Sequence, residues 1–212
     1  MSVNDLLSDV TIEQLPERLR EAVARVGWTA LMPVQARAIP YMLAARNMMI
    51  QARTGSGKTG AFLLPMLERL NPVRRYCQAL ILVPTRELAR QVGQEAERIC
   101  GAAGFRTVVV YGGVGYGEQI DALKQGAQIV VGTPGRTLDH LLKRTFSLDE
   151  IEMLIFDEAD RMLSMGFYPD MKQVQGYLPN RNLQTCMFSA TFPVYRDFRS
   201  LTSEKSVSAD LQ

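Results

Sequence analysis

The chain has 212 residues, of which 47% are apolar and 22% charged, so it can bury a core and is not a wholly disordered protein. The net charge of +2 is too small to identify a partner. Cys77, Cys100 and Cys186 contain no C-x-x-C pair, which argues against a disulfide framework or a zinc site and favours a reducing compartment. The first ten residues are polar and acidic, and no apolar run reaches the roughly 20 residues of a membrane span. We therefore expect a cytoplasmic protein that contacts no membrane.

Two helical segments are predicted at the start of the chain. The first begins near Pro16, a favourable first-turn residue, and Gly27 ends it. The second runs from about Pro33 to Ala45. Apolar residues recur at helical spacing along the first segment, which predicts one buried face.

Short apolar runs then alternate with longer amphipathic ones. The predicted strands are Met48–Gln51, Ala79–Val83, Thr107–Tyr111, Ile129–Val131, Met153–Phe156 and Thr185–Phe188. The predicted helices are Lys58–Leu70, Glu87–Cys100, Tyr116–Lys124, Thr137–Lys143 and Tyr168–Tyr177. Strands that are apolar throughout indicate a doubly wound α/β fold, with a mostly parallel sheet and helices on both faces. Ligands bind such sheets at the carboxyl ends of the strands.

A glycine-rich loop follows the first predicted strand and precedes a helix. It reads Ala52-Arg53-Thr54-Gly55-Ser56-Gly57-Lys58-Thr59, which fits G-x-x-x-x-G-K-[ST] except for Ala52 at the first position. The glycines let backbone N–H groups turn toward phosphate oxygens, and the helix N-terminus adds to the attraction. Lys58 would reach the outer phosphates, and the Thr59 hydroxyl would bind Mg²⁺. The alternative is a glycine-rich turn without a ligand.

An acidic segment ends the fifth predicted strand. Asp157 is expected to bind the Mg²⁺ shell, and Glu158 to position and polarise an attacking water. Simple helix capping is the alternative for these carboxylates. Together with the phosphate loop, the segment favours a nucleotide-hydrolysing site in which Lys58, Asp157 and Glu158 are catalytic.

With these residues in place, the chain resembles the DEAD-box family of ATP-dependent RNA helicases. Asp157-Glu158-Ala159-Asp160 spells the family's name, and further family segments follow in the family's order. These are Pro84-Thr85-Arg86-Glu87-Leu88, Gly112-Gly113, Thr133-Pro134-Gly135-Arg136 and Ser189-Ala190-Thr191. The resemblance implies a RecA-like P-loop domain, ATP and Mg²⁺ as ligands, and RNA as the partner. It covers about residues 10 to 193.

The family's adenine-reading segment is less regular here. Gly27-Trp28 and Pro33-Val34-Gln35 match it, which places Gln35 where a carboxamide reads the adenine edge. Leu31 and Met32 replace a common Pro-Thr, and Val10 stands where an aromatic residue usually stacks on adenine. If that alignment holds, these departures weaken nucleotide binding or adenine selectivity. Trp28 is interpreted as a core or surface-covering aromatic residue.

The resemblance also implies which residues contact RNA and which couple the two activities. RNA contacts fall on Pro84, Thr85, Arg86, Gly113, Thr133, Pro134 and Arg136, which follow strands and therefore lie on the same sheet edge as the phosphate loop. Such backbone contacts predict sequence-tolerant, salt-dependent binding. The alternatives are an ion pair between Arg86 and Glu87 and a helix-surface charge for Arg136. The resemblance also implies that Asp160, Ser189, Ala190 and Thr191 couple ATP hydrolysis to strand separation. The Ser189 and Thr191 hydroxyls would change hydrogen-bond partners as the bound nucleotide changes.

The predicted organisation has three parts and lacks a fourth. Residues 1–30 form an extension and the start of the adenine-reading segment, 31–200 the first helicase domain, and 201–212 a tail or interdomain linker. The family's second helicase domain, which supplies arginine fingers, is expected to lie outside this chain. Two rival functions remain, an RNA clamp that does not hydrolyse ATP and a P-loop ATPase acting on DNA or protein.

Overall fold

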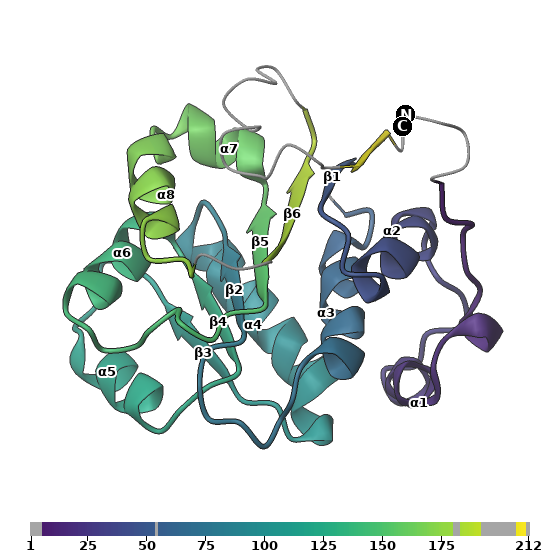
Figure 1. The fold of residues 1–212 in the computed structure, drawn as a ribbon, viewed down its shortest axis with the longest axis horizontal. Helices are drawn as coiled ribbons and strands as arrows, with labels where there is room; N and C mark the ends of the chain where they lie inside the picture. Colours follow the sequence, from purple (N-terminus) through teal and green to yellow (C-terminus); the bar gives the residue numbers. More distant parts are fainter. Residues whose placement is uncertain (1–5, 54, 180–182, 192–206, 211–212) are drawn as a thin grey trace.

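The computed structural model describes residues 6–53, 55–179, 183–191 and 207–210. A parallel sheet with strand order β3-β4-β2-β5-β6-β1-β7 forms its centre (Figure 1). The strands are β1 (Met48–Gln51), β2 (Ala79–Leu82), β3 (Thr107–Val110), β4 (Ile129–Gly132), β5 (Met153–Asp157), β6 (Gln184–Ser189) and β7 (Val207–Asp210). Every strand pair is parallel, which confirms the predicted fold class.

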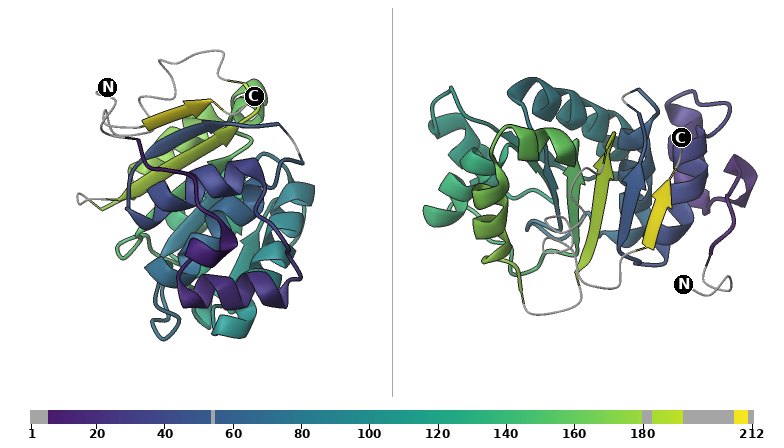
Figure 2. Two further views of the ribbon diagram at one scale, coloured as in Figure 1. Left: turned by 90° about the vertical axis from the view of Figure 1, so that its right-hand side faces the viewer. Right: turned by 90° about the horizontal axis from the view of Figure 1, so that it is seen from above.

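Helices cover both faces of the sheet (Figures 1 and 2). One face carries α1 (Glu17–Arg25), α2 (Pro33–Leu43), α3 (Lys58–Arg69) and α4 (Arg86–Cys100). The other carries α5 (Gly117–Lys124), α6 (Pro134–Leu142), α7 (Ala159–Ser164) and α8 (Tyr168–Gln175). Two 3₁₀ turns, Ile12–Gln14 and Gly101–Ala103, complete the described elements.

Two cores follow from this layering. In β2, Ala79 and Ile81 belong to the first core, whereas Leu80 and Leu82 belong to the second. Successive strand residues point to opposite faces, so a strand covered on both sides is apolar at every position. The continuous apolar runs of the sequence have this origin.

Two elements differ from the sequence-based expectation on the second face. The helix α6 begins at Pro134 rather than Thr137, because proline is pre-organised for the first helical position. The short helix α7 follows the acidic segment and was not predicted, since its six residues carry too little periodicity.

A further strand lies within the segment predicted as a tail or linker. Val207–Asp210 forms β7, which pairs in parallel with β1 and is not among the predicted strands. Without β7, β1 would be an edge strand with unpaired N–H and C=O groups, and such edges readily accept another strand. The rest of the predicted tail lies outside the described residues. Among the helices that the structure does describe, none is both long and apolar enough to cross a membrane.

Candidate active site

The order of the strands brings three predicted segments to one place. Strands β5, β6 and β1 are neighbours, so the acidic segment, the Ser189–Thr191 segment and the phosphate loop all lie at their carboxyl ends (Figure 1). The N–H of Ala52 donates to the carbonyl oxygen of Ser189 at 2.9 Å. The start of the phosphate loop is therefore tied directly to the end of β6.

The phosphate loop has the backbone of an anion cradle. Gly55 and Gly57 have φ values of +80° and +86°, in the left-handed region that favours glycine. A Cβ on Gly57 would lie 2.5 Å from the Met32 sulfur, so a larger residue cannot fit without displacing its neighbours. The Ser56 hydroxyl oxygen is buried and has no hydrogen-bond partner among the described residues. An unpaired hydroxyl between two such glycines suits a phosphate oxygen. Thr54 lies outside the described residues.

Lys58 stands at the first position of α3 and is almost fully buried, with 6% of its surface exposed. Its ammonium group donates to the carbonyl oxygen of Ala52 at 3.0 Å. The lysine therefore folds back across the loop, toward the space that the loop encloses. Thr59, next along the helix, is half-buried and lines the same cavity.

Asp157 ends β5 and is buried, with 3% of its surface exposed. Burial raises the pKa of its carboxyl group from 3.8 to about 6, although the positive charge of Lys58 lowers the pKa. Its Oδ1 accepts a hydrogen bond from the Glu158 N–H at 3.0 Å. A buried carboxylate that lacks a direct cationic partner is suited to a divalent ion. No cluster of three or more His, Cys, Asp or Glu side chains that could hold a metal ion occurs in the described ranges.

The substitution Asp157→Asn should stabilise the ligand-free protein near pH 7.5. A carboxyl whose folded-state pKa is raised contributes stability below its unfolded pKa of 3.8, and that contribution is lost as pH rises through about 6. A shift of about two units corresponds to about 3 kcal/mol. Urea unfolding at pH 4 and pH 7.5 should show little difference at pH 4 and a more stable variant at pH 7.5. A variant of lower stability at pH 7.5 would contradict the burial cost assigned to Asp157.

Glu158 occupies the turn between β5 and α7 with φ of +52°. Left-handed backbone costs a non-glycine residue about 1–2 kcal/mol, so the fold holds this residue against its preference. The Glu158 side chain lies 3.3 Å from Arg161 and lines the same cavity as Lys58. Glu158 is therefore part of the wall of that cavity.

Three hydrogen bonds link Asp160 to Ser189, at the end of β6, and to Thr191, and a fourth joins Ser189 to Thr191. The N–H and the hydroxyl of Thr191 donate to Asp160 Oδ2 at 3.0 and 2.9 Å. The Asp160 N–H donates to the Ser189 hydroxyl at 3.2 Å, and this hydroxyl donates to the Thr191 carbonyl oxygen at 2.6 Å. Burial raises the pKa of the Asp160 carboxyl group, but hydrogen bonding with the Ser189 and Thr191 side chains and with the backbone N–H groups of Arg161 and Thr191 lowers this pKa overall. Ala190 is the connecting residue.

The predicted adenine-reading residue lies against the phosphate loop. The Gln35 side chain accepts from the Met32 N–H at 2.9 Å and donates to the Gly57 carbonyl oxygen at 3.1 Å. A carboxamide has two N–H groups and two lone pairs, so Gln35 keeps one donor and one acceptor for a base edge. Together with the loop, Asp157 and Glu158, Gln35 lines a cavity of about 680 Å³.

The wall of this cavity was only partly predicted. Trp28 is half-buried and packs against the first core, as expected, but it also lines the cavity beside Gly60. Met32 lines the cavity as well, and 41% of its surface is exposed. Val10 packs on the core and is absent from the lining residues that the structure describes. Trp28 and Met32 therefore contribute apolar surface to the cavity, together with Ala30, Leu88 and Val92.

The predicted RNA-contacting residues gather at the carboxyl ends of β2, β4 and β3, which are neighbours. Thr85 caps α4 by accepting from the Leu88 N–H at 3.2 Å, whereas the Thr133 hydroxyl makes no such cap on α6. Arg86 is exposed and pairs with Glu87 at 3.2 Å, as the alternative interpretation expected. An Arg86 nitrogen lies 3.4 Å from where a Cβ on Gly113 would stand. Pro84 and Pro134 are buried next to these residues.

The environment of Arg136 excludes one of the two interpretations of this residue. It is only 8% exposed, so it is not a helix-surface charge. Its guanidinium donates to the Val114 carbonyl oxygen at 2.9 Å and to Gln119 Oε1 at 3.3 Å, and lies 4.0 Å from the Tyr116 ring centre. Gln119 also donates to the Tyr111 carbonyl oxygen at 3.1 Å. Arg136 and Gln119 therefore hold both ends of the loop that carries Gly112-Gly113. Gln119 was missed because its role depends on this long-range contact.

The histidine and the three cysteines of the chain are buried. His140 contacts Thr145 and Gln119 through its two ring nitrogens at 2.8 and 3.1 Å. Cys77, Cys100 and Cys186 are buried thiols, and burial raises the pKa of each to about 12. These cysteines therefore act as small core residues.

A parallel sheet that presents a glycine-rich loop, a buried lysine and an acidic segment at one edge defines a P-loop nucleotide-binding domain of the RecA-like type. The sequence profile of the DEAD/DEAH box helicase family matches residues 32–198. The chain belongs to this family.

Individual proteins similar to this chain belong to the same family. The chain is 47% identical over 180 residues to the ATP-dependent RNA helicase DeaD of Haemophilus influenzae, covering 84% of this chain and 29% of the relative. It is 44% identical to the DEAD-box ATP-dependent RNA helicase CshA of Bacillus licheniformis, covering 85% of this chain and 37% of the relative. The crystal structure of a DEAD box protein from Methanococcus jannaschii superimposes with a TM-score of 0.88 at 36% identity, covering 97% of this chain and 57% of that one. The chain thus spans about a third of these curated relatives.

Proposed function

We propose that this domain binds ATP–Mg²⁺ and the sugar-phosphate backbone of RNA, and that it couples ATP hydrolysis to local unwinding together with a second domain. The observation that carries the proposal is the set of hydrogen bonds joining Asp160 to Ser189 and Thr191. These bonds connect the acidic segment of the nucleotide site to the strand next to the phosphate loop. A change at the nucleotide can therefore be transmitted to β6.

The nucleotide roles rest on the cavity residues. Loop residues Ala52, Arg53, Thr54, Gly55, Ser56 and Gly57 would surround the phosphates, and Lys58 would bind the outer ones. Thr59 and Asp157 would hold Mg²⁺, which neutralises charge that develops on the phosphates. Glu158 would orient water and accept its proton. Gln35 would read the base edge.

The RNA roles rest on the neighbouring strand ends. Thr85, Arg86, Gly113 and Thr133 would contact phosphate and ribose through hydroxyls, N–H groups and a guanidinium. Pro84 and Pro134 would shape these turns. We propose that Arg136 supports RNA binding by holding the glycine loop in place. Binding of this kind is independent of base sequence and weakens with salt.

A second domain of the full-length chain would complete the nucleotide site. In related phosphoryl-transfer enzymes an arginine finger contributes about 10³–10⁵ in rate. Residues 1–212 alone should therefore bind ATP but show little RNA-stimulated hydrolysis. The three buried cysteines are in keeping with the reducing, cytoplasmic compartment that we propose for the protein.

The test compares purified residues 1–212 with the chain joined to a second helicase domain. ATP binding is expected in both, whereas ATP hydrolysis stimulated by RNA is expected only in the joined protein. Robust unwinding by residues 1–212 would contradict the need for a second domain. Stimulation by single-stranded DNA as strong as by RNA would favour the rival DNA-directed ATPase, and RNA binding without hydrolysis in the joined protein would favour the clamp.

A further inference from the structure

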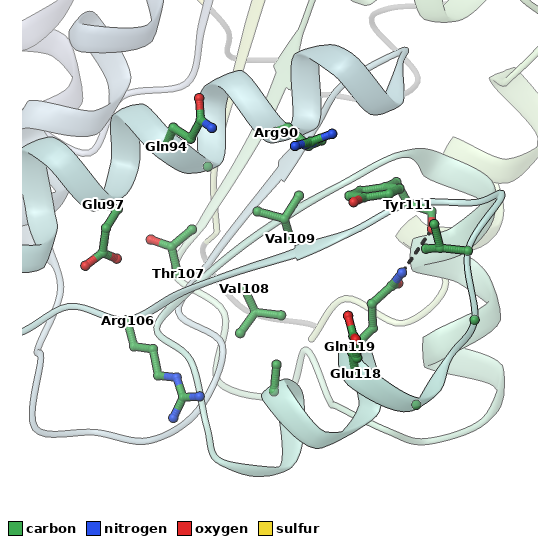
Figure 3. Close-up of a pocket in the computed structure, with 15 residues that line it drawn as sticks. Arg90, Gln94, Glu97, Arg106, Thr107, Val108, Val109, Tyr111, Glu118 and Gln119 are labelled. Carbon is green, nitrogen blue, oxygen red and sulfur yellow. Dashed lines mark hydrogen bonds between the residues drawn. The ribbon is translucent and has the colours of Figure 1, made fainter.

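A groove runs along the side of α4, between this helix, strand β3 and the loop 111–117 (Figure 3). Two cavities of about 490 and 970 Å³ form it, and they share the lining residues Arg90, Gln94, Tyr111 and Val114. Gln91 lines both the smaller cavity and the nucleotide cavity. The helix α4 therefore separates the groove from the nucleotide site.

The groove begins at the proposed RNA surface. Arg86 lines the smaller cavity and lies beside Gly113. Arg90 and Gln94 follow it at four-residue intervals on α4, so all three side chains lie on one face of the helix. The polar wall of the groove is thus a direct continuation of the Arg86 contact surface.

The end of the groove formed by the smaller cavity has side chains suited to an RNA nucleotide. Arg90 is exposed, and within the described ranges its guanidinium makes no hydrogen bond or ion pair, whereas Arg86 pairs with Glu87. Opposite the arginines, Tyr111 is half-buried and Val114 is 43% exposed. A cationic wall facing an aromatic and apolar surface is the arrangement that binds single strands, with phosphates on the cations and bases stacked on the ring.

The opposite end of the groove, at Glu97 and Arg106 in the larger cavity, is less suited to RNA. Glu97 lines it, and the guanidinium of Arg106 is bound to Gln125. A second carboxylate of the larger cavity, Glu118, lies on α5 beside Gln119. Figure 3 shows Glu97 and Arg106 at the end away from Tyr111. Carboxylates repel phosphates, so the end at Glu97 is unfavourable for RNA. Glu87 lines the smaller cavity near Arg90, but its carboxylate is paired with Arg86 at 3.2 Å.

We propose that the part of the groove formed by Arg90, Gln94, Tyr111 and Val114 binds one unpaired RNA nucleotide beyond those contacted by the Arg86 surface. Arg90 contacts its phosphate, and its base stacks on Tyr111. The inference rests on the proposed function, because the nucleotide belongs to a strand already held at Arg86 and Gly113. It adds a site that recognises single-stranded character without base sequence.

The test measures binding of a labelled oligouridylate to residues 1–212 by fluorescence anisotropy at several salt concentrations. Arg90→Ala should lower affinity about 3- to 10-fold and reduce the slope of log affinity against log salt by about 0.7, the value for one phosphate contact on a single strand. Tyr111→Leu should lower affinity at least about fivefold, and Tyr111→Phe should bind like the wild type, because stacking needs the ring and not the hydroxyl. Arg98→Ala is the matched control, since Arg98 lies on the same helix but pairs with Glu95 at 2.6 Å and is outside the groove.

The outcomes separate the two proposals. If the wild type binds no RNA, the proposed function fails. If the wild type binds, Arg86→Ala weakens binding, and Arg90→Ala and Tyr111→Leu match the wild type, the function stands and the groove site is wrong. Unchanged RNA binding together with binding of an extended peptide along β3 would also overturn the groove site, because it would assign the groove to a protein segment.

Discussion

Replacement of Lys58 by methionine is expected to weaken ATP binding about 10- to 150-fold. The side chain is buried at the first position of α3, and its ammonium group is bound only to the Ala52 carbonyl oxygen in the described structure. A hydrogen bond to a charged partner contributes about 1.5–3 kcal/mol, and phosphate oxygens are such partners. Methionine keeps the unbranched stem that packs in the loop and removes the charge. Titration with a fluorescent ATP analogue in the presence of Mg²⁺ measures the effect.

Two controls make this result specific. Lys124→Met removes a lysine from the exposed end of α5 and should leave ATP affinity unchanged. Urea unfolding of Lys58→Met without ligand shows whether the variant is folded, because Lys58 also lowers the pKa of the buried Asp157. A folded Lys58→Met that binds ATP like the wild type would show that the loop does not hold the phosphates.

The parallel sheet could be predicted because burial on both faces leaves a direct signal in the sequence. Met48–Gln51 is predicted and observed with the same bounds, since the run is apolar and ends at the glycine-rich loop. The phosphate loop could be predicted for a related reason. Its glycines are required by local backbone geometry, and local geometry depends on neighbouring residues alone.

The environment of Arg136 could not be predicted in the same way. Its burial depends on the loop 111–117 folding back over α6 and on Gln119, which is 17 residues away along the chain. Nothing in the sequence next to Arg136 distinguishes this packing from an exposed contact with RNA. The strand β7 was missed for a similar reason, because its pairing partner β1 lies far away in the sequence. The burial of Arg136 and the pairing of β7 depend on residues far away in the sequence, and the periodicity of a short segment contains no information about such partners.

Combined replacement of Ser189 and Thr191 by alanine is expected to reduce unwinding at least about tenfold while ATP hydrolysis stays close to wild type. The Thr191 hydroxyl donates to the Asp160 carboxylate, and a lost hydrogen bond to a charged group costs about 1.5–3 kcal/mol. The Ser189 hydroxyl bonds only neutral backbone groups in the described structure, and such a bond contributes about 0.5–1.5 kcal/mol. Lys58, Asp157 and Glu158 keep their places in the double variant, so the hydrolytic groups remain. The measurement compares RNA-stimulated ATP turnover with strand separation in the chain joined to its second domain.

The remaining contacts explain why the two activities should separate. The Thr191 N–H still donates to Asp160 in the double variant, so the acidic segment stays in position. The links that can change partners are the two hydroxyls. Their removal leaves the Thr191 N–H as the remaining bond to Asp160, which weakens the connection between the nucleotide site and β6 without removing the groups of the site. Ser164→Ala is the control, because that hydroxyl donates only to the Arg161 carbonyl oxygen on α7. Equal loss of hydrolysis and unwinding would place Ser189 and Thr191 in the catalytic step itself and remove their coupling role.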